Sequence, residues 1–209
     1  MLKNNKKNSW EWRCFYGQEK VKNNILNLID FNIPKPKNIE YTDKYIIIPN
    51  LSHNIKLRKT TDPILEELHV KKIIKTQNNI FKFSRKTKFS FPIIENDLLK
   101  LKILKILNEN SNIKSLNSTK DIFNIEKNNY SFCLVKKNIV RYNIKKKISK
   151  FEKDMRLEFA NLYINNILHK TISLKCTSMQ VILEILQRLD MLDLKCTNYV
   201  NYIKNLGAK

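Results

Sequence analysis

Positive charges in the middle of strand-like runs constrain the fold of this chain more than any other feature. Apolar and polar residues alternate in several short runs, which predicts strands because residues i and i+2 lie on the same face. The first run, 9–15, places Glu11 and Arg13 on one face and two tryptophans on the other. A sheet with one wet cationic face would repel itself, whereas a closed barrel can hold a polyanion inside and leaves no free edge.

The same pattern returns in later runs. Lys56 and Arg58 share a face in the run 54–58, and His69 shares a face with Lys71 in the run 65–74. Lysine and arginine form strong charge-assisted hydrogen bonds to phosphate oxygens, so we expect the strand cations to line one concave phosphate-binding site. The expected set is Arg13, Lys56, Arg58, Lys71, Lys88, Lys136, Lys137 and Arg141.

The order of the predicted elements indicates an α+β fold with a large, mostly antiparallel sheet and helices packed outside it. Strands are predicted at 9–15, 45–48, 54–58, 65–74, 80–91, 130–137, 139–144, 156–164 and 171–176, and helices at 19–29, 98–107, 178–189 and 199–206. Residues 1–8 are expected to form a solvated basic tail. No low-complexity linker divides the remainder, so residues 9–209 are predicted to form a single domain.

Composition narrows the function classes. The formal net charge is +21, with 40 Lys and Arg against 19 Asp and Glu, which favours a polyanionic partner. Only two glycines occur, so a glycine-rich phosphate loop of the P-loop or Rossmann type is excluded. Four scattered cysteines without a CxxC pair argue against zinc and for a reduced, cytoplasmic protein. The sequence has no long apolar stretch and no apolar run near Met1, so neither a membrane span nor a secretory signal is expected.

Several motifs together resemble a known family. Ser9-Trp10-Glu11-Trp12-Arg13 resembles the ExExK signature of the CYTH superfamily, also called triphosphate tunnel metalloenzymes. Lys56-Leu57-Arg58 resembles its basic strand, His69-Val70-Lys71 its next lysine strand, and Lys88, Lys136-Lys137, Arg141 and Glu158 follow in a similar order. The resemblance implies an eight-stranded antiparallel tunnel that binds triphosphate or polyphosphate. It also implies that Glu11 and Glu158 hold Mg²⁺ or Mn²⁺.

The sequence departs from this family at two acidic positions. Ser9 replaces the first acid of the signature, and Lys175 stands on a late strand where an acid is usual. Two carboxylates are compatible with one Mg²⁺ ion, which often binds through phosphate oxygens and waters as well. A metal-dependent triphosphatase and a tunnel that binds phosphates without cleaving them therefore both remain, and no catalytic residue is assigned.

A different class of function also fits the charge. A basic nucleic-acid-binding or ribosome-associated protein would spread its cations over one outer face instead of directing them inward. The three histidines, His53, His69 and His169, have no acidic neighbours at triad or ligand spacing, so serine-hydrolase chemistry is not indicated. The sequence makes no prediction about oligomeric state.

Overall fold

The computed structural model describes residues 8–15, 35–49, 51, 53–59, 66–94, 115–124, 130–148 and 151–207. The strands of the main sheet are β1 (Ser9–Phe15), β2 (Lys37–Ile47), β3 (Asn54–Lys59), β4 (Glu66–Lys71), β5 (Ile73–Gln77), β6 (Ile80–Phe83), β7 (Thr87–Ser90), β10 (Ser131–Ile148), β11 (Phe151–Ile164) and β12 (Ile167–Cys176). A small sheet consists of β8 (Ile93–Ile94) and β9 (Ser115–Leu116). The helices are α4 (Thr119–Asn124), α5 (Met179–Arg188) and α6 (Tyr199–Gly207).

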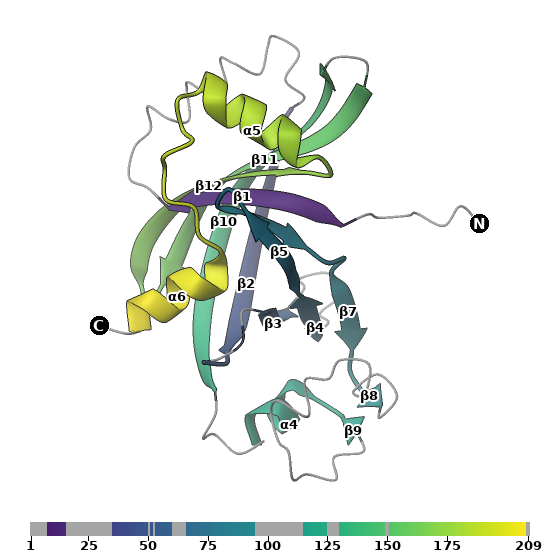
Figure 1. The fold of residues 1–209 in the computed structure, drawn as a ribbon. Coiled ribbons are helices and arrows are strands. Elements are labelled where there is room, and N and C mark those ends of the chain that lie inside the picture. The colour runs from purple at the N-terminus through teal and green to yellow at the C-terminus, as the bar shows by residue number, and fades with distance from the viewer. Residues whose placement is uncertain are drawn as a thin grey trace, which may run out of the picture.

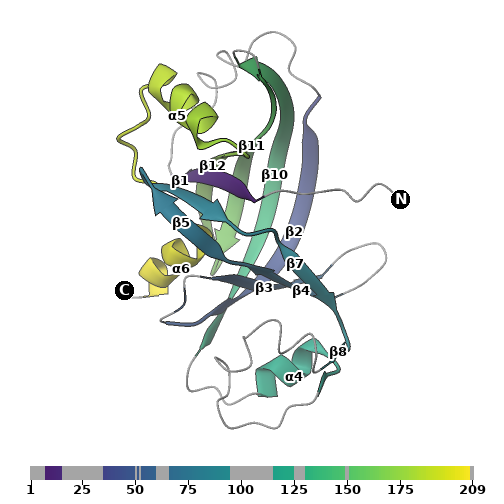
Figure 2. The ribbon, with the colours of Figure 1, turned by 45° about the vertical axis from the view of Figure 1, so that its right-hand side comes forward.

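The ten strands of the main sheet pair antiparallel in the order β5-β6-β1-β12-β11-β10-β2-β3-β4-β7. The long strands β10, β11 and β2 form its back wall, and the shorter strands curl round in front of them (Figures 1 and 2). The mostly antiparallel α+β architecture predicted from the sequence is therefore confirmed.

One hairpin connects the two ends of this sheet. Lys72 alone separates β4 from β5, and residues 84–86 separate β6 from β7. β4 and β7 lie at one end of the sheet, whereas β5 and β6 lie at the other. The backbone N–H of Ser84 donates to the carbonyl of Lys72 at 2.8 Å, so the hairpin continues between its two halves. The sheet must curl for a single hairpin to reach both ends.

The closed barrel of eight strands that the family resemblance implies is not what the described residues form. They form a curled sheet of ten strands in which the end strands, β5 and β7, are not paired with each other. The reason is that the runs 65–74 and 80–91, each predicted as one strand, both break near the middle. Each run therefore contributes one strand to each end of the sheet.

Two further expectations about strands need correction. Residues 130–137 and 139–144 were predicted as two strands, but all of them except Tyr130 belong to the single strand β10, in which Asn138 pairs with Glu40 and Asn161. The solvated turn predicted at 145–147 lies within β10, which extends to Ile148. β2 and β11 pair with β10 on both sides of Asn138, and β11 alone pairs with residues 145–147. This tertiary pairing overrides the local turn propensity of asparagine and lysine.

Asparagine pairs form two tight turns among the described residues of the sheet. Asn78 and Asn79 connect β5 to β6, and Asn165 and Asn166 connect β11 to β12. All four have φ between 50° and 63°. Two-residue hairpin turns of the I′ type require positive φ at both positions, and asparagine adopts it at lower cost than other non-glycine residues. The chain thus makes its hairpins with few glycines.

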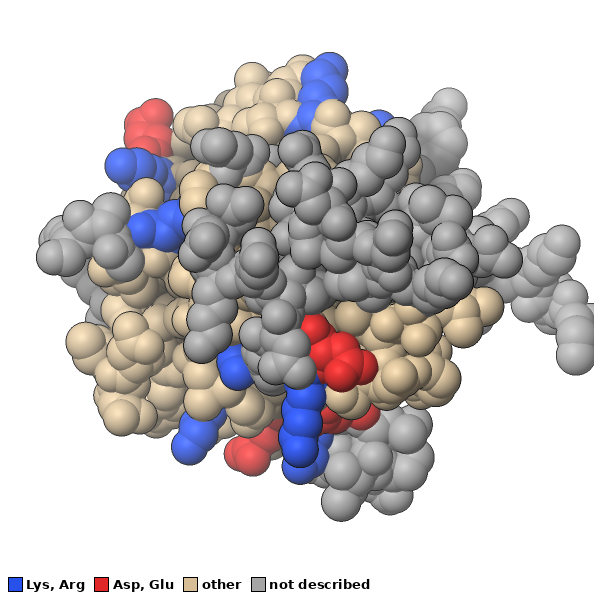
Figure 3. Space-filling view, turned by 90° about the horizontal axis from the view of Figure 1, so that it is seen from below, with Lys and Arg blue, Asp and Glu red and all other residues tan. Residues whose placement is uncertain are grey.

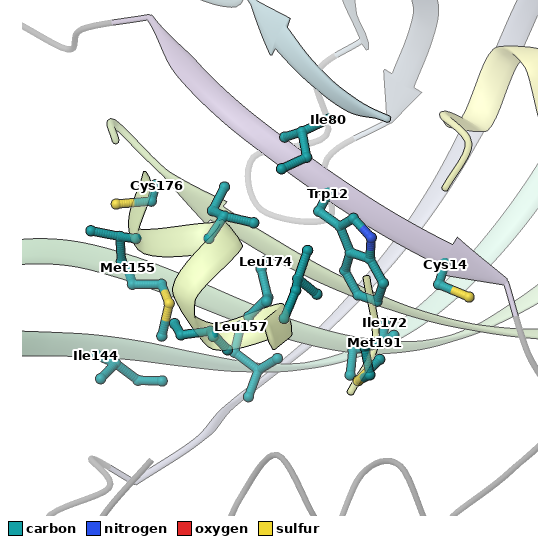
Figure 4. Close-up of a cluster of buried hydrophobic side chains, with 14 of the residues drawn as sticks. Trp12, Cys14, Ile80, Ile144, Met155, Leu157, Ile172, Leu174, Cys176 and Met191 are labelled. Carbon is teal, nitrogen blue, oxygen red and sulfur yellow. The ribbon is translucent and has the colours of Figure 1, made fainter. Parts of the chain in front are cut away.

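The outer face of the sheet packs on α5. Trp12, Leu157, Ile172 and Leu174 are at most 1% exposed and form one core with Val181, Ile182, Ile185 and Leu186 of the helix (Figure 4). These helix positions are the apolar stripe that the sequence predicts for 178–189. The predicted core role of the tryptophans is confirmed for Trp12, and the half-buried Trp10 packs against the same cluster.

Helix α6, predicted at 199–206, packs on the inner face instead of outside. Val200 and Ile203 are buried against Ile47, Val135 and Leu162, which share the inner face of the sheet with the charged residues described below.

A third core packs α4 and the small sheet against the outer face of β2, β3 and β4. The expected helices at 19–29 and 98–107, and nearly all of the expected tail at 1–8, lie outside the described residues. No helix within the described part of the chain is long and apolar enough to cross a bilayer.

Candidate anion-binding site

The charged residues predicted from strand alternation converge on the inner face of the curled sheet. Cross-strand registers place Arg13 opposite Ser173, Arg141 opposite Glu158, and Asp43 opposite Arg58. Seven of the eight predicted cations lie on this face: Arg13, Lys56, Arg58, Lys71, Lys88, Lys137 and Arg141. All of these side chains except Lys88 divide into two groups, each organised around carboxylates.

The first group, the Glu11 cluster, contains Glu11, Arg13, Lys71, Arg141 and Glu158. Glu11 accepts from the guanidinium of Arg13 at 3.1 Å and from Lys71 Nζ at 2.8 Å. Glu158 accepts from Arg141 Nε at 2.7 Å, and its second oxygen lies 3.9 Å from Arg13 Nη2. The cations Lys71 and Arg13 hold the pKa of Glu11 far below its usual value although burial opposes this. Arg13 therefore bridges the two carboxylates of this cluster.

Lys175 adds another charge next to this cluster. Lys175 of β12 stands directly opposite Glu11 of β1 on one side and opposite Arg156 of β11 on the other. Burial, with the nearby charge of Lys71, lowers the pKa of Lys175 to about 8. The substitution that distinguishes this chain from the family pattern thus places a titratable cation beside Glu11.

The second group, the Asp43 cluster, contains Asp43, Tyr45, Lys56, Arg58 and Lys137. Asp43 is 0% exposed, and Arg58 binds it bidentately, with Nε 2.6 Å from Oδ1 and Nη2 2.8 Å from Oδ2. Lys56 Nζ and Lys137 Nζ lie 2.7 and 2.8 Å from Oδ2. Lys137 also donates to the hydroxyl of Tyr45. One buried carboxylate therefore holds three cations in a fixed arrangement.

Tyr199 of α6 connects the two clusters. Its hydroxyl accepts from Arg13 Nη1 at 3.0 Å. The centre of its ring lies 4.1 Å from the guanidinium carbon of Arg13 and 4.2 Å from Lys137 Nζ, distances at which cations interact with an aromatic face. The C-terminal helix thus contributes to the site as well as covering the apolar end of the inner face.

Two predicted cations do not join either cluster. Lys136 is exposed on the outer face of β10, because neighbouring residues of a strand point in opposite directions and Lys137 is buried on the inner face. Lys88 of β7 stands opposite His69 and so lies on the inner face, but its side chain is 49% exposed at the end of the sheet, where it forms an ion pair with Glu67. The predicted phosphate-binding set therefore contains one residue, Lys136, that the fold directs away from the site.

His69 has an acidic partner that was not expected from the sequence. Its Nε2 lies 2.7 Å from Glu67 Oε2, two residues earlier on the same face of β4. Burial lowers the pKa of His69 to about 4, so the ring is neutral at pH 7. The expectation that no histidine has an acidic neighbour is wrong for this residue.

The two carboxylates predicted to hold Mg²⁺ or Mn²⁺ do not fit that role in the observed arrangement. Every oxygen of Glu11 and Glu158 faces a guanidinium or ammonium group, so a metal ion would have to displace Arg13, Lys71 or Arg141. Lys175 opposes a dication at the same place through its own charge. Among the described residues, no three His, Cys, Asp or Glu side chains are grouped at a metal-binding spacing.

Sequence reasoning missed Asp43 and Tyr199, which organise the site. The predicted strand began at Tyr45, whereas β2 begins at Lys37, so Asp43 was not recognised as a strand residue. It stands two positions before Tyr45, and this spacing is the signal that would have placed both on one face. Nothing in the local sequence places Tyr199 on the inner face, because its contacts join residues 186 positions apart.

Comparison with known proteins finds solved structures of similar fold but no similar sequence. The sequence matches no protein-family model and no curated protein. Among solved structures, the PH1012 protein of Pyrococcus horikoshii OT3 is similar over 92% of this chain and 98% of its own, with a TM-score of 0.51 and 14% identity. A conserved hypothetical protein of Pyrococcus furiosus covers the same shares at 0.48 and 16%. The mimivirus capping enzyme triphosphatase covers 90% of both chains at 0.45 and 13%.

At such low identity, these similarities concern the fold and not the chemistry. This chain shares the fold of the PH1012 protein over nearly its whole length. What the site of this chain does has to be argued from its own residues.

Proposed function

We propose that this protein binds a triphosphate group or a short polyphosphate on the inner face of its curled sheet. The observation that carries the proposal is the charge balance of that face. Seven cations lie in or beside the two clusters, namely Arg13, Lys56, Arg58, Lys71, Lys137, Arg141 and Lys175, against the three carboxylates Glu11, Asp43 and Glu158. On the same face, Glu67 and Lys88 form an ion pair and cancel each other in this balance. The surplus of four positive charges calls for an anion, and a triphosphate carries a comparable negative charge.

The geometry of the donors suits phosphate. Three of the cations are arginines, whose planar guanidinium binds oxyanions through two parallel hydrogen bonds. Burial lowers the pKa of both Lys56 and Lys137, and nearby cations lower it further, so their ammonium groups are not fully neutralised by Asp43. An anion bound there would restore those pKa values, and this gain in free energy favours binding.

Binding is proposed without a requirement for a divalent ion, and hydrolysis is expected to be weak or absent. Phosphoanhydride cleavage needs developing charge to be neutralised, usually by cations together with a metal. Here the cations are present, but Glu11 and Glu158 are held by Arg13, Lys71 and Arg141 and do not fit a metal ion.

The inward direction of the cations supports this function over nucleic-acid binding. A nucleic-acid interface needs its cations on an accessible outer face. The seven cations counted above instead face the inside of the sheet, and Figure 3 shows described basic and acidic side chains intermixed on the face it views.

Calorimetric titration with tripolyphosphate, in EDTA and in Mg²⁺, tests the proposal. We expect binding in EDTA and a rise in melting temperature by mass action, with an RNA oligonucleotide lacking a 5′-triphosphate as the comparison. Absence of binding at millimolar tripolyphosphate would refute the function. Phosphate release at about 1 per second or faster with Mg²⁺ or Mn²⁺ would show that the protein is an enzyme.

A further inference from the structure

The Asp43 cluster has an unusual charge balance for a buried ion pair. A single carboxylate with no exposed surface accepts from Lys56, Arg58 and Lys137, and the group as a whole retains two positive charges. A buried charge is costly unless it is paired, and surplus like charges at such distances repel strongly. Within the cluster, Asp43 is therefore the one carboxylate that binds these three cations, and it neutralises them only in part.

The cations of this cluster keep capacity for a second acceptor. An ammonium group has three donors, and the side chain of Lys56 is 13% exposed although one donor binds Asp43. Arg58 uses Nε and Nη2 for Asp43, and its guanidinium lies 3.6 Å from the ring centre of Tyr41. Among the described residues, Nη1 of Arg58 donates no hydrogen bond to a side chain or carbonyl.

The bidentate contact between Asp43 and Arg58 is also the contact that an arginine makes with phosphate, since carboxylate and phosphate oxygens fit the same fork. We propose that Asp43 is an internal counterion that stands in for a ligand phosphate in the free protein. Its carboxylate and the bound anion act as alternative neutralisers of Lys56, Arg58 and Lys137. This inference rests on the proposed function of the site and assigns Asp43 a positioning role in it.

If Asp43 and the bound anion are alternative counterions, the stability lost on removing the charge of Asp43 depends on whether the anion is bound. Removing the charge of Asp43 leaves three cations without their counterion, so the free protein loses stability. A bound polyanion replaces the missing charge, so the same variant gains more from the ligand than the wild type does. A purely structural hydrogen-bonding role would lower stability equally with and without the ligand.

The test compares Asp43→Asn, which has nearly the same shape, with the wild type by thermal unfolding with and without 1 mM tripolyphosphate. We expect a lower melting temperature for the free variant and a shift by tripolyphosphate that is about twice that of the wild type. Glu184→Gln is the matched control, because it removes one carboxylate on the outside of α5, where Glu184 pairs with Arg188. It should change neither value.

A second variant keeps the proposal testable if Asp43→Asn folds poorly. Adding Lys137→Met restores the former charge balance, so the double variant should be more stable than Asp43→Asn alone and should respond to ligand like the wild type. A double variant less stable than the single one would overturn the counterion role, as would an equal tripolyphosphate shift in Asp43→Asn and wild type. If the wild type itself shows no shift, the proposed function fails instead.

Discussion

The two clusters on the inner face use carboxylates in opposite ways. Asp43 is one fully buried acid surrounded by three cations, whereas Glu11 and Glu158, with side chains 11% and 15% exposed, share Arg13 and hold Lys71 and Arg141. The first arrangement fixes cations in place, and its loss leaves charges that water cannot solvate. The second has acids and cations in near balance, so it can lose one partner and re-pair. We therefore expect the free energy of unfolding of the ligand-free protein to depend more on the Asp43 cluster than on the Glu11 cluster.

The largest expected effect compares the removal of one acid from each cluster. Asp43→Ala should lower the free energy of unfolding by about 3–5 kcal/mol, the usual cost of leaving buried charges unpaired. Glu158→Ala should cost about 1–2 kcal/mol, because Arg13 keeps Glu11 as a partner and Arg141 is partly exposed. Urea denaturation in the absence of ligand measures both. Equal losses would contradict the distinction between the clusters.

A smaller effect concerns pH and Lys175, beside the Glu11 cluster. Because the pKa of Lys175 is about 8, its charge is present below that pH and lost above it. Its contribution to anion binding should follow the same direction. We expect wild type to bind tripolyphosphate about tenfold more tightly than Lys175→Met at pH 6.5, with the ratio near one at about pH 9.5. Using the ratio cancels the titration of tripolyphosphate itself.

A ratio that stays constant across this range would show that Lys175 remains charged or takes no part in binding. Calorimetry at four pH values in one ionic strength is sufficient. The comparison also tests whether Lys175, at a position where the family usually has an acid, contributes to the ligand site of this chain.

The sequence predicted the parts of this molecule that depend on local pattern. Alternation was sufficient to place Glu11 and Arg13 on one face of β1, and helical spacing identified the buried stripe of α5. It could not show that the runs 65–74 and 80–91 are each divided between two ends of the sheet. That division depends on which neighbours pair with each half, and pairing is a tertiary property.

The cations of the candidate site were predictable from the sequence, but their partners were not. Eight cations were assigned to the inner face from their places on predicted strands, and seven of them lie on it. Lys136 was misplaced because two lysines stand side by side, and only the register of β10 decides which one points inward. The partners of the cations were not predictable, since Asp43 and Tyr199 come from distant segments.

Lys136 and Lys137 therefore offer the most direct test of the central claim, that the inner face binds the anion. They are adjacent on β10, carry the same charge and point to opposite faces, so Lys136→Met and Lys137→Met remove the same charge from opposite faces of the sheet. At physiological ionic strength, calorimetric titration with tripolyphosphate should show binding weakened about tenfold by Lys137→Met. Lys136→Met should stay within about twofold of the wild type, because charges on the outer face are screened. Equal weakening by the two substitutions would contradict the account.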